Sequence, residues 1–594
     1  MEQERKVGNN MPYPDLQSYI LALEGAGELH RIKVEVDPEL EITEIATRVV
    51  REKGPALLFE KVKGSQFPVA INLMASEKRI EMALGRPPAA LGEEIRHFME
   101  RLSPPSIGAF WEHRSFLHRL ISFRLAKAKH SPCQEVIQHP TNLCALPVLK
   151  CWPEDGGRFF TLPMIYTQDP DTGHKNLGMY RLQVFSKDST GMHWQIQKGG
   201  SFHYYQSEQK DIPLEAAVIL GGDPTMILCA AMPLPDGMDE VMFSGLLRHQ
   251  ATRMTDAKTI SLRVPANAEF IMEGIVPPHE RRIEGPFGDH LGHYSDAAEF
   301  PVFYVKTITH RKNAIYPATV VGKPPQEDCY MVNAIQELLN PFVKITHSGV
   351  IDLWAYSDAG FHNLLVVSTR HRYEMEPIRV AMGLLGEGQV TLTKCLVLVD
   401  SSVDVRDPYA VLIAIRENFF VEADCLILSQ GPLDTLDFTS GKMNVGGKLI
   451  MDATSKRPVQ TIKPFTEDVQ TLCPEALDFR VLEDTLLVVK VKDKGREIVQ
   501  RLVRLLEHSG LKMIAAVSDD IDLSDDTQLM WGLMVRFDVV KDIVFSQMET
   551  RGCTTTYGGV MGIDATMKPK YSDILEMDPA IVKKVDNRWE EYWK

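Results

Sequence analysis

Apolar residues near the start of the chain recur first with helical spacing and then in strand-like runs. From Asp15 to Glu24 they fall on one helical face, and the glycine-rich stretch 25–27 ends that pattern. The short apolar runs 56–59 and 67–72 are typical of strands. The pattern therefore predicts a mixed α/β domain over residues 1–125.

From about residue 130 the spacing changes to that of a β-rich domain. Short apolar runs alternate with turns of Gly, Pro and Asp, at 179–185, 216–220, 226–231 and 302–308. We interpret each run as a strand, and residues 240–248 as a helical insertion. This pattern predicts a barrel-like domain over residues 126–330.

The remaining chain alternates strand and helix patterns, which predicts α/β domains, and it repeats itself. Five segments recur in the same order: 364–367 as 486–489, 384–385 as 505–506, 399–404 as 517–522, 428–430 as 545–547, and 452–454 as 564–566. The repeat predicts a duplicated domain, at 331–465 and again at 466–594. The alternative is two unrelated α/β domains that share common strand patterns.

Composition is that of an ordinary globular protein. Of 594 residues, 44% are hydrophobic and 24% are charged, which excludes collagen-like, low-complexity and wholly disordered classes. The net charge of −15 disfavours general nucleic-acid binding, because such a chain repels a phosphate backbone.

Two further patterns concern location. The first residues have no apolar core of a secretory signal, and no stretch is apolar enough for a transmembrane helix. The nine cysteines are scattered and form no CxxC pair. Together these patterns predict a cytoplasmic protein with free thiols.

Candidate chemistry is densest between residues 176 and 290. Asn176 and Arg181 share a short strand. Asn176 offers a neutral oxygen ligand to a hard cation, and Arg181 offers a planar guanidinium group to a carboxylate. His193 and Glu240 are further potential ligands. Each also has an ordinary explanation: a polar strand face, a packed histidine, or a carboxylate that complements a helix dipole.

Glu284 and Asp289 flank a Gly-Pro-Phe-Gly turn, the most suggestive segment of the chain. A tight bend would point both acids at one centre, where their pKa values would separate as a proton-transfer pair requires. The alternative is a polar turn with solvated acids. Lys394 begins an otherwise apolar strand, where a lysine either binds an anion or extends toward solvent.

Taken in order, these segments resemble the UbiD family of prenylated-flavin (de)carboxylases over about residues 12–460. The matching motifs are Asn176 to Arg181, His193, Met232 with Glu240, Glu284 to Asp289, and Asp452 to Thr454. The resemblance implies a split β-barrel that binds prenylated FMN. It also implies a divalent metal, Mn²⁺ or Mg²⁺, and a monovalent cation such as K⁺ at the flavin phosphate.

The same resemblance implies two sets of binding residues. The metal ligands would be Asn176, His193 and Glu240. The cofactor-binding residues would be these three together with Arg181, Met232 and Lys394.

For catalysis the resemblance implies a network of Arg181, Glu284 and Asp289. Arg181 would orient the substrate carboxylate and pair with Glu284. Asp289 would donate the proton, with its pKa raised by an apolar site and by Glu284. Some members of the family have Glu at this position, so the shorter Asp289 changes the donor geometry.

We therefore expect a non-oxidative decarboxylase of an aromatic carboxylic acid, in which the cofactor acts as a covalent electron sink. Segments 317–328, 359–363 and 431–437 resemble the decarboxylases of menaquinone biosynthesis by the futalosine route, which implies a naphthoate-type substrate. The expected partners are a flavin prenyltransferase that supplies the cofactor and further copies of this chain, as a dimer or hexamer. The second domain copy would then be an oligomer or packing module.

Three alternatives stay open at this point. The chain could be a non-catalytic flavin-binding or assembly subunit of a larger carboxylase, although retention of Arg181, Glu284 and Asp289 disfavours this. It could decarboxylate another (hetero)aromatic acid. It could also be an oxidoreductase that uses ordinary FMN.

Overall fold

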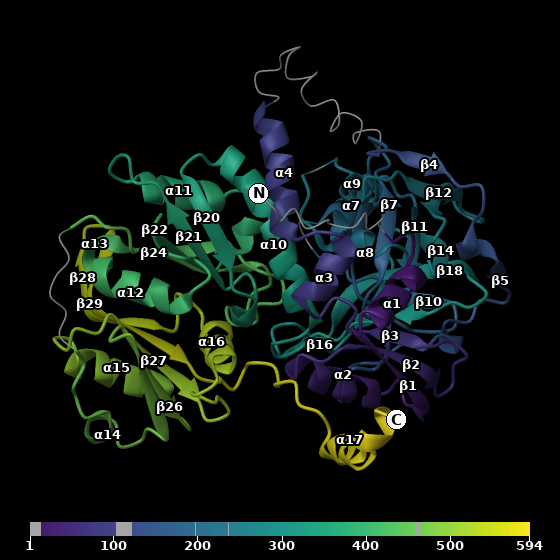
Figure 1. The fold of residues 1–594 in the computed structure, drawn as a ribbon. Coiled ribbons are helices and arrows are strands. Elements are labelled where there is room, and N and C mark those ends of the chain that lie inside the picture. Colours follow the sequence, from purple (N-terminus) through teal and green to yellow (C-terminus); the bar gives the residue numbers. More distant parts are fainter. Residues whose placement is uncertain (1–12, 102–121, 196–197, 236, 458–463) are drawn as a thin grey trace, which may run out of the picture. The chain divides into compact units, whose positions relative to one another are not determined.

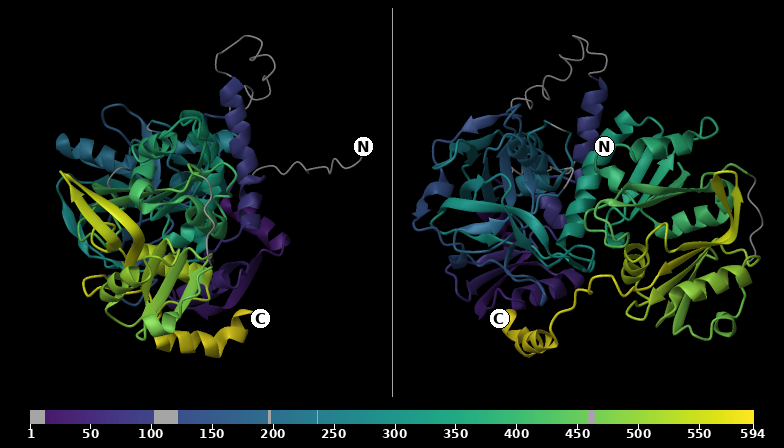
Figure 2. Two further views of the ribbon diagram at one scale, coloured as in Figure 1. Left: turned by 90° about the vertical axis from the view of Figure 1, so that its left-hand side faces the viewer. Right: turned by 180° about the vertical axis from the view of Figure 1, so that it is seen from behind.

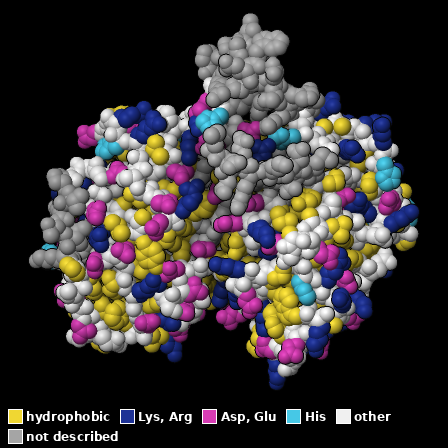
Figure 3. All heavy atoms as spheres, in the orientation of Figure 1, with side chains coloured by type: hydrophobic (Ala, Val, Ile, Leu, Met, Phe, Trp, Pro, Cys, Tyr) yellow, Lys and Arg dark blue, Asp and Glu magenta, His cyan; other side chains and the backbone are white. Residues whose placement is uncertain are grey.

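The computed structural model describes residues 13–101, 122–195, 198–235, 237–457 and 464–594. They form two compact units: one comprises residues up to Leu338 together with Ile574–Lys594, and the other comprises Leu339–Asp573 (Figure 1). Basic and acidic side chains are interspersed on the visible face of each unit (Figure 3). Within the described ranges, no helix is both long and apolar enough to cross a membrane.

The first unit starts with a four-stranded sheet in the order β1-β2-β3-β19. Its strands are β1 (Leu29–Val36), β2 (Ala56–Val62), β3 (Val69–Ile71) and β19 (Tyr316–Pro317). The helices of this region are α1 (Leu16–Gly25), α2 (Glu41–Arg51), α3 (Glu77–Leu84) and α4 (Pro88–Arg101). Asp15 caps α1 by accepting a hydrogen bond from the Ser18 amide at 2.9 Å. The predicted helix and both predicted strands are confirmed.

An eight-stranded antiparallel sheet forms the centre of the same unit. Its path is β10 (Ser189–Gly191), β18 (Ala298–His310), β14 (Phe270–Val276), β11 (Leu214–Leu220), β7 (Met164–Gln168) and β8 (Lys175–Met179), while β15 (Arg281–Glu284) and β5 (Val136–Gln138) also pair with β18. The β-rich prediction is confirmed. Over the residues that the structure describes, the pairings leave this sheet open rather than closed into a barrel.

Smaller elements surround this sheet. They are the strands β4 (Leu125–Lys127), β12 (Thr252–Asp256) and β13 (Arg263–Pro265), the pairs β6 (Phe159–Phe160) with β9 (Leu182–Gln183) and β16 (Phe287–Gly288) with β17 (Tyr294–Ser295), and the helices α7 (Gly199–Gln209), α8 (Pro224–Ala231) and α9 (Glu240–Leu247). Helix α9 confirms the predicted helical insertion.

The interpretation of residues 226–231 as a strand was wrong, because they belong to helix α8. A short apolar run has no periodicity that separates a buried strand from a buried helix. The decisive feature is local: Asp223 accepts a hydrogen bond from the Met226 amide at 2.9 Å, and Pro224 occupies the first helical turn.

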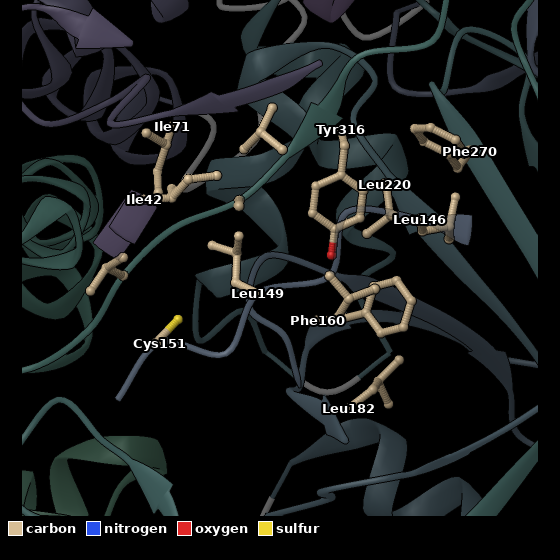
Figure 4. Close-up of a cluster of buried hydrophobic side chains, with 14 of the residues drawn as sticks. Ile42, Ile71, Leu146, Leu149, Cys151, Phe160, Leu182, Leu220, Phe270 and Tyr316 are labelled. Carbon is tan, nitrogen blue, oxygen red and sulfur yellow. The ribbon is translucent and has the colours of Figure 1, made fainter. Parts of the chain in front are cut away.

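One hydrophobic core joins the two main sheets of this unit. Ile42, Ile71 and Tyr316 reach it from the region of the four-stranded sheet, and Phe160 and Leu220 from the central part (Figure 4). All five side chains are buried. The N-terminal and central segments are therefore packed as one folded body.

The end of the chain returns to this unit. Helix α17 (Pro579–Tyr592) lies beside α2 (Figures 1 and 2). The buried Glu41 carboxylate accepts hydrogen bonds from Lys584 at 2.9 Å and from the Tyr592 hydroxyl at 2.7 Å. We expected residues 466–594 to form the second domain copy, but the structure groups those after Asp573 with the first unit.

The second unit consists of two five-stranded sheets with the same topology. The first runs β20 (Val350–Ala355), β21 (Leu364–Thr369), β22 (Cys395–Asp400), β24 (Val445–Asp452), β23 (Cys425–Pro432), and the second runs β25 (Asp478–Leu482), β26 (Leu486–Val491), β27 (Met513–Ser518), β29 (Thr554–Ala565), β28 (Ile543–Arg551). In both, the two middle pairings are parallel and the two edge pairings antiparallel. The predicted duplication is confirmed.

The helices of this unit complete the two copies. They are α11 (Glu376–Leu384), α12 (Pro408–Asn418) and α13 (Val421–Asp424) in the first copy, and α14 (Val469–Leu472), α15 (Gly495–Leu505) and α16 (Asp526–Val535) in the second. Helix α10 (Glu327–Thr346) precedes them and contains the boundary between the units.

The two copies exchange equivalent contacts. The Lys394 ammonium of the first copy lies over the ring of Phe537 in the second, 4.9 Å from its centroid. Its counterpart Lys512 lies over the ring of Phe420 in the first copy, at 4.1 Å. Reciprocal contacts of this kind are the mark of pairing about an approximate twofold axis.

Candidate active site

Arg181 is the centre of a buried polar cluster in the first unit. It follows β8, and its Nε donates to Glu284 Oε1 at 3.0 Å. Nη1 donates to Asp289 Oδ2, and Nη2 donates to Ser295 Oγ at 3.0 Å. The guanidinium also stacks on Phe287, 4.5 Å from the ring centroid. The fork is thus held in one orientation by partners on every side.

A backbone turn brings the two acids to this guanidinium. Glu284 ends β15, and Gly285 follows with φ of +100°, a conformation that disfavours any side chain. Strand β16 then pairs with β17, so that Asp289 stands at the start of a hairpin loop. The expectation that this turn points both acids at one centre agrees with the geometry.

Glu284 connects the guanidinium to His193. His193 Nδ1 lies 2.9 Å from Glu284 Oε1, and both side chains are buried. Burial, reinforced by the charge of Arg181, lowers the pKa of His193, which favours the neutral imidazole. Burial alone would raise the pKa of Glu284, but the hydrogen bond from His193 and the charge of Arg181 lower it overall.

The expected raised pKa of Asp289 is wrong for this state of the protein. Burial acts in the raising direction, yet the hydrogen bond from His290 and the charge of Arg181 hold the pKa of Asp289 well below its usual range. Asp289 is therefore an ionised acceptor here, because Arg181 and His290 stabilise its charge despite the burial of the site.

Asn176 and Glu240 form a second buried group. Glu240 is the first residue of α9, and its two carboxylate oxygens accept hydrogen bonds from Asn176 Nδ2 at 3.0 Å and from the Leu177 amide at 2.8 Å. Burial raises the pKa of Glu240 to about 8.

Two buried side-chain atoms of the predicted metal ligands have no hydrogen-bond partner in the described part of the chain. They are Asn176 Oδ1 and His193 Nε2. Unpaired buried acceptors cost free energy, so such atoms in a native site call for a ligand or a water. With the Glu240 carboxylate they supply oxygen and nitrogen donors of the kinds that a divalent cation accepts.

Two further predicted residues lie apart from these contacts. Met232 is the buried residue that ends α8. Lys394 belongs to the second unit, where its buried ammonium donates to Asp437 Oδ2 at 3.1 Å and to the Phe537 carbonyl at 3.2 Å. The cofactor-binding roles of both residues stay predictions.

Several residues of the cluster were missed by sequence reasoning. Ser295 and Phe287 touch Arg181, His290 touches Asp289, and Asp155 accepts a hydrogen bond from the Gly288 amide at 2.8 Å. Phe287, within the Gly-Pro-Phe-Gly turn, and His290, adjacent to Asp289, carried a local signal. The others depend on the pairing of β16 with β17 and on contacts between segments far apart in sequence.

This fold and this site define a multidomain α/β protein in which a buried guanidinium is held between two acids. The chain matches three family models of 3-octaprenyl-4-hydroxybenzoate carboxy-lyase. The N-terminal domain matches residues 20–99, and the Rift-related domain matches residues 124–324. The C-terminal domain matches residues 329–453 and 467–565. The chain belongs to the UbiD family and is a carboxy-lyase of that family. The predicted resemblance is confirmed at the level of the family.

Individual relatives agree with this assignment. A Chlamydia pneumoniae protein that is named as one of the subunits of 4-hydroxybenzoate decarboxylase is 36% identical, over 97% of this chain and 98% of its own. The closed-form structure of vanillic acid decarboxylase from Sedimentibacter hydroxybenzoicus is 26% identical, with a TM-score of 0.67 over 77% of this chain and 97% of that one.

A third protein is similar in fold alone. An evolved dimeric form of the UbiD-class enzyme HmfF from Pelotomaculum thermopropionicum, in complex with prFMN, is 24% identical, with a TM-score of 0.63 over 76% of this chain and 97% of that one.

Proposed function

We propose that this protein is a non-oxidative decarboxylase of an aromatic carboxylic acid that uses prenylated FMN. The observation that carries the proposal is the buried network in which Arg181 holds Glu284 and Asp289. It supplies one cation for a substrate carboxylate, one acid for proton transfer and a second acid that holds the cation in place. Vanillic acid decarboxylase and prFMN-bound HmfF, both similar in fold, support the substrate class and the cofactor.

Asn176, His193 and Glu240 would hold the divalent metal, Mn²⁺ or Mg²⁺, with K⁺ as a second cation at the flavin phosphate. The support is their donor set, which includes two buried atoms without a hydrogen-bond partner among the described residues. Prenylated FMN supplies an electron sink for the charge left when CO₂ departs. Arg181, Met232 and Lys394 are the remaining proposed cofactor-binding residues.

The acids have a definite task in this proposal. A substrate carboxylate that binds Arg181 offsets the positive charge that keeps Asp289 ionised, so the pKa of Asp289 rises when substrate binds. Asp289 then takes up one proton, and the hydrogen-bonded His290 relays it. When the bond between the ring carbon and CO₂ breaks, that proton forms the new C–H bond, and Asp289 returns to its ionised state.

Glu284 keeps the guanidinium of Arg181 in position during this proton transfer. It is fully buried and bonded to both Arg181 and His193. It therefore stays in place while Asp289 exchanges its partner, and it keeps the guanidinium oriented toward the substrate.

For the substrate we propose a naphthoate-type acid of menaquinone biosynthesis, handled by a cytoplasmic homo-oligomer with a flavin prenyltransferase as cofactor supplier. The support is the resemblance of segments 317–328, 359–363 and 431–437 to that subgroup. A non-catalytic assembly subunit is not favoured, because such a subunit would have no need to keep Arg181, Glu284 and Asp289 bonded to one another.

The test is to purify the protein from cells with and without a flavin prenyltransferase. We expect CO₂ release from a naphthoate only in the first preparation, together with an absorbance spectrum that differs between the two. A panel of benzoates and heteroaromatic acids identifies the ring system. Absence of CO₂ release from every acid, with the flavin fully bound, would contradict the proposal.

A further inference from the structure

The loop that carries Asp289 is bordered by a segment from the far end of the sequence. His293, which ends this loop, pairs with Ile574 in an antiparallel bridge. The amide of Leu575 donates to the Gly292 carbonyl at 2.9 Å. Within the loop itself, the Asp289 amide donates to the His293 carbonyl at 3.0 Å. The C-terminal segment thus forms an additional edge of the hairpin that presents the acid.

The side chain of Leu575 fills a space left by two glycines. It is 3% exposed. A Cβ atom on Gly288, the residue before Asp289, would lie 2.8 Å from Leu575 Cδ2 and 2.2 Å from Trp152 Cδ1. A Cβ atom on Gly322 would lie 3.6 Å from Leu575 Cδ1 and 2.8 Å from Trp152 Cζ2. Leu575 and Trp152 therefore pack directly against the backbone that leads into Asp289.

Helix α17 anchors this segment a few residues further on. Glu41 is 1% exposed and receives Lys584, Arg588 and Tyr592. A buried carboxylate is stable only with such partners, so these contacts fix where the helix docks. Val585 and Tyr592 are also buried in the main core of this unit. The segment is thus held at the loop and again at α2.

We propose that residues 574–594 contribute to catalysis by supporting the Asp289 loop, with Leu575 as the residue that positions this loop. The proposal rests on the catalytic role of Asp289 proposed above. Leu575 acts by holding Gly288 and Gly292, which set where Asp289 stands. Small misplacements of a catalytic group cost up to about a hundredfold in rate.

The first experiment compares Leu575→Ala with Leu575→Met in the full holoenzyme. We expect Leu575→Ala to lower kcat by about tenfold or more, with little change in KM and in flavin content, and Leu575→Met to restore most of the rate. The matched control is Leu477→Ala, a leucine that is 59% exposed in the second unit. An unchanged kcat in Leu575→Ala would overturn the proposal.

The second experiment does not depend on catalysis. Hydrogen exchange of residues 287–295 is measured in apoprotein and holoprotein for the wild type and for Leu575→Ala. We expect faster exchange in this loop for Leu575→Ala and wild-type exchange for Leu477→Ala. Unchanged exchange would overturn the positioning role even if no substrate is ever found. Faster exchange in a protein that decarboxylates no acid would overturn the proposed function instead.

The third experiment separates the segment from the rest of the chain. A protein that ends at Asp573 is mixed with a synthetic peptide of residues 574–594. We expect saturable recovery of loop protection and of activity, and weaker recovery with a peptide that carries Leu575→Ala. If the shortened protein does not fold, the point variants still decide the matter. Full activity of the shortened protein without peptide would overturn the proposal.

Discussion

His193 and Glu284 share a hydrogen bond of 2.9 Å that connects a proposed metal ligand to the guanidinium cluster of the candidate active site. On one side, Glu284 holds the guanidinium of Arg181. On the other, His193 Nε2 is buried without a hydrogen-bond partner in the described ranges of the chain. The proposed metal site and the proposed catalytic network are therefore coupled through the Glu284 carboxylate. A substitution in either one should alter the geometry of the other.

Glu240→Ala is expected to lose most of the bound flavin and metal while the protein remains folded. The substitution removes a carboxylate ligand and leaves Asn176 Nδ2 and the Leu177 amide without their acceptor. Metal analysis and flavin absorbance of the purified variant measure the loss, with circular dichroism to verify folding. The control is Glu299→Ala, at an exposed position. Full occupancy in Glu240→Ala would remove the metal assignment.

Asp289→Asn is expected to keep the cofactor and to lose turnover by about a hundredfold or more, the usual scale for a proton-transfer group. The amide preserves the shape of the side chain but cannot accept and return a proton. Steady-state kinetics with the best acid from the substrate panel measure the effect. Near-normal turnover would transfer the donor role to Glu284 or to water.

The same variant tests the ionised state of Asp289. The folded-state pKa is depressed, so its contribution to stability is present above the unfolded pKa of about 4 and is lost as the pH falls through the folded value. The free energy of unfolding of the wild type should therefore fall relative to Asp289→Asn as the pH decreases from about 5 to 3. Urea titrations across this range measure the difference. A constant difference would contradict the depressed pKa.

Lys394→Met tests whether this lysine binds the cofactor or stabilises the fold of the second unit. Its removal leaves Asp437 buried without its cation, which typically costs about 3–5 kcal/mol. We expect a clear loss of stability, and the double change with Asp437→Leu should recover part of it. Loss of flavin in the double variant, with stability restored, would support the cofactor-binding role that the family resemblance implies.

A chain that ends at Asp468 tests the pairing of the two domain copies. The surface of the first copy that meets the second has reciprocal contacts, such as Lys394 over Phe537 and Lys512 over Phe420. A surface of this kind suits a second copy of itself. We expect the shortened chain to self-associate or to lose solubility, as measured by light scattering. With peptide 574–594 added it should regain the loop protection described above.

Flavin content separates two explanations of any loss in that shortened chain. If the mass per particle is unchanged and flavin is lost, the second copy or the tail contributes to cofactor binding directly. If flavin is kept and association increases, the second copy acts as the partner of the first within one chain.

Much of the fold and part of the site followed from the sequence because the signals were local. The repeat of Asp452 to Thr454 at Asp564 to Thr566 predicted two equal domains, and the structure has two sheets with one strand order. The Gly-Pro-Phe-Gly turn predicted that Glu284 and Asp289 converge, because glycine permits the positive φ found at Gly285. The order of the motifs identified the family.

The apolar pattern alone missed the remaining features, and two of them depend on contacts between distant segments. Residues 226–231 form a helix because their capping by Asp223 outweighs an ambiguous apolar run. Asp289 is ionised because folding brings Arg181 to it, and this charge together with the hydrogen bond from the adjacent His290 exceeds the effect of burial. The placement of Leu575 against Gly288 joins segments that the whole second unit separates in sequence, and the docking of α17 on Glu41 helps to hold them together.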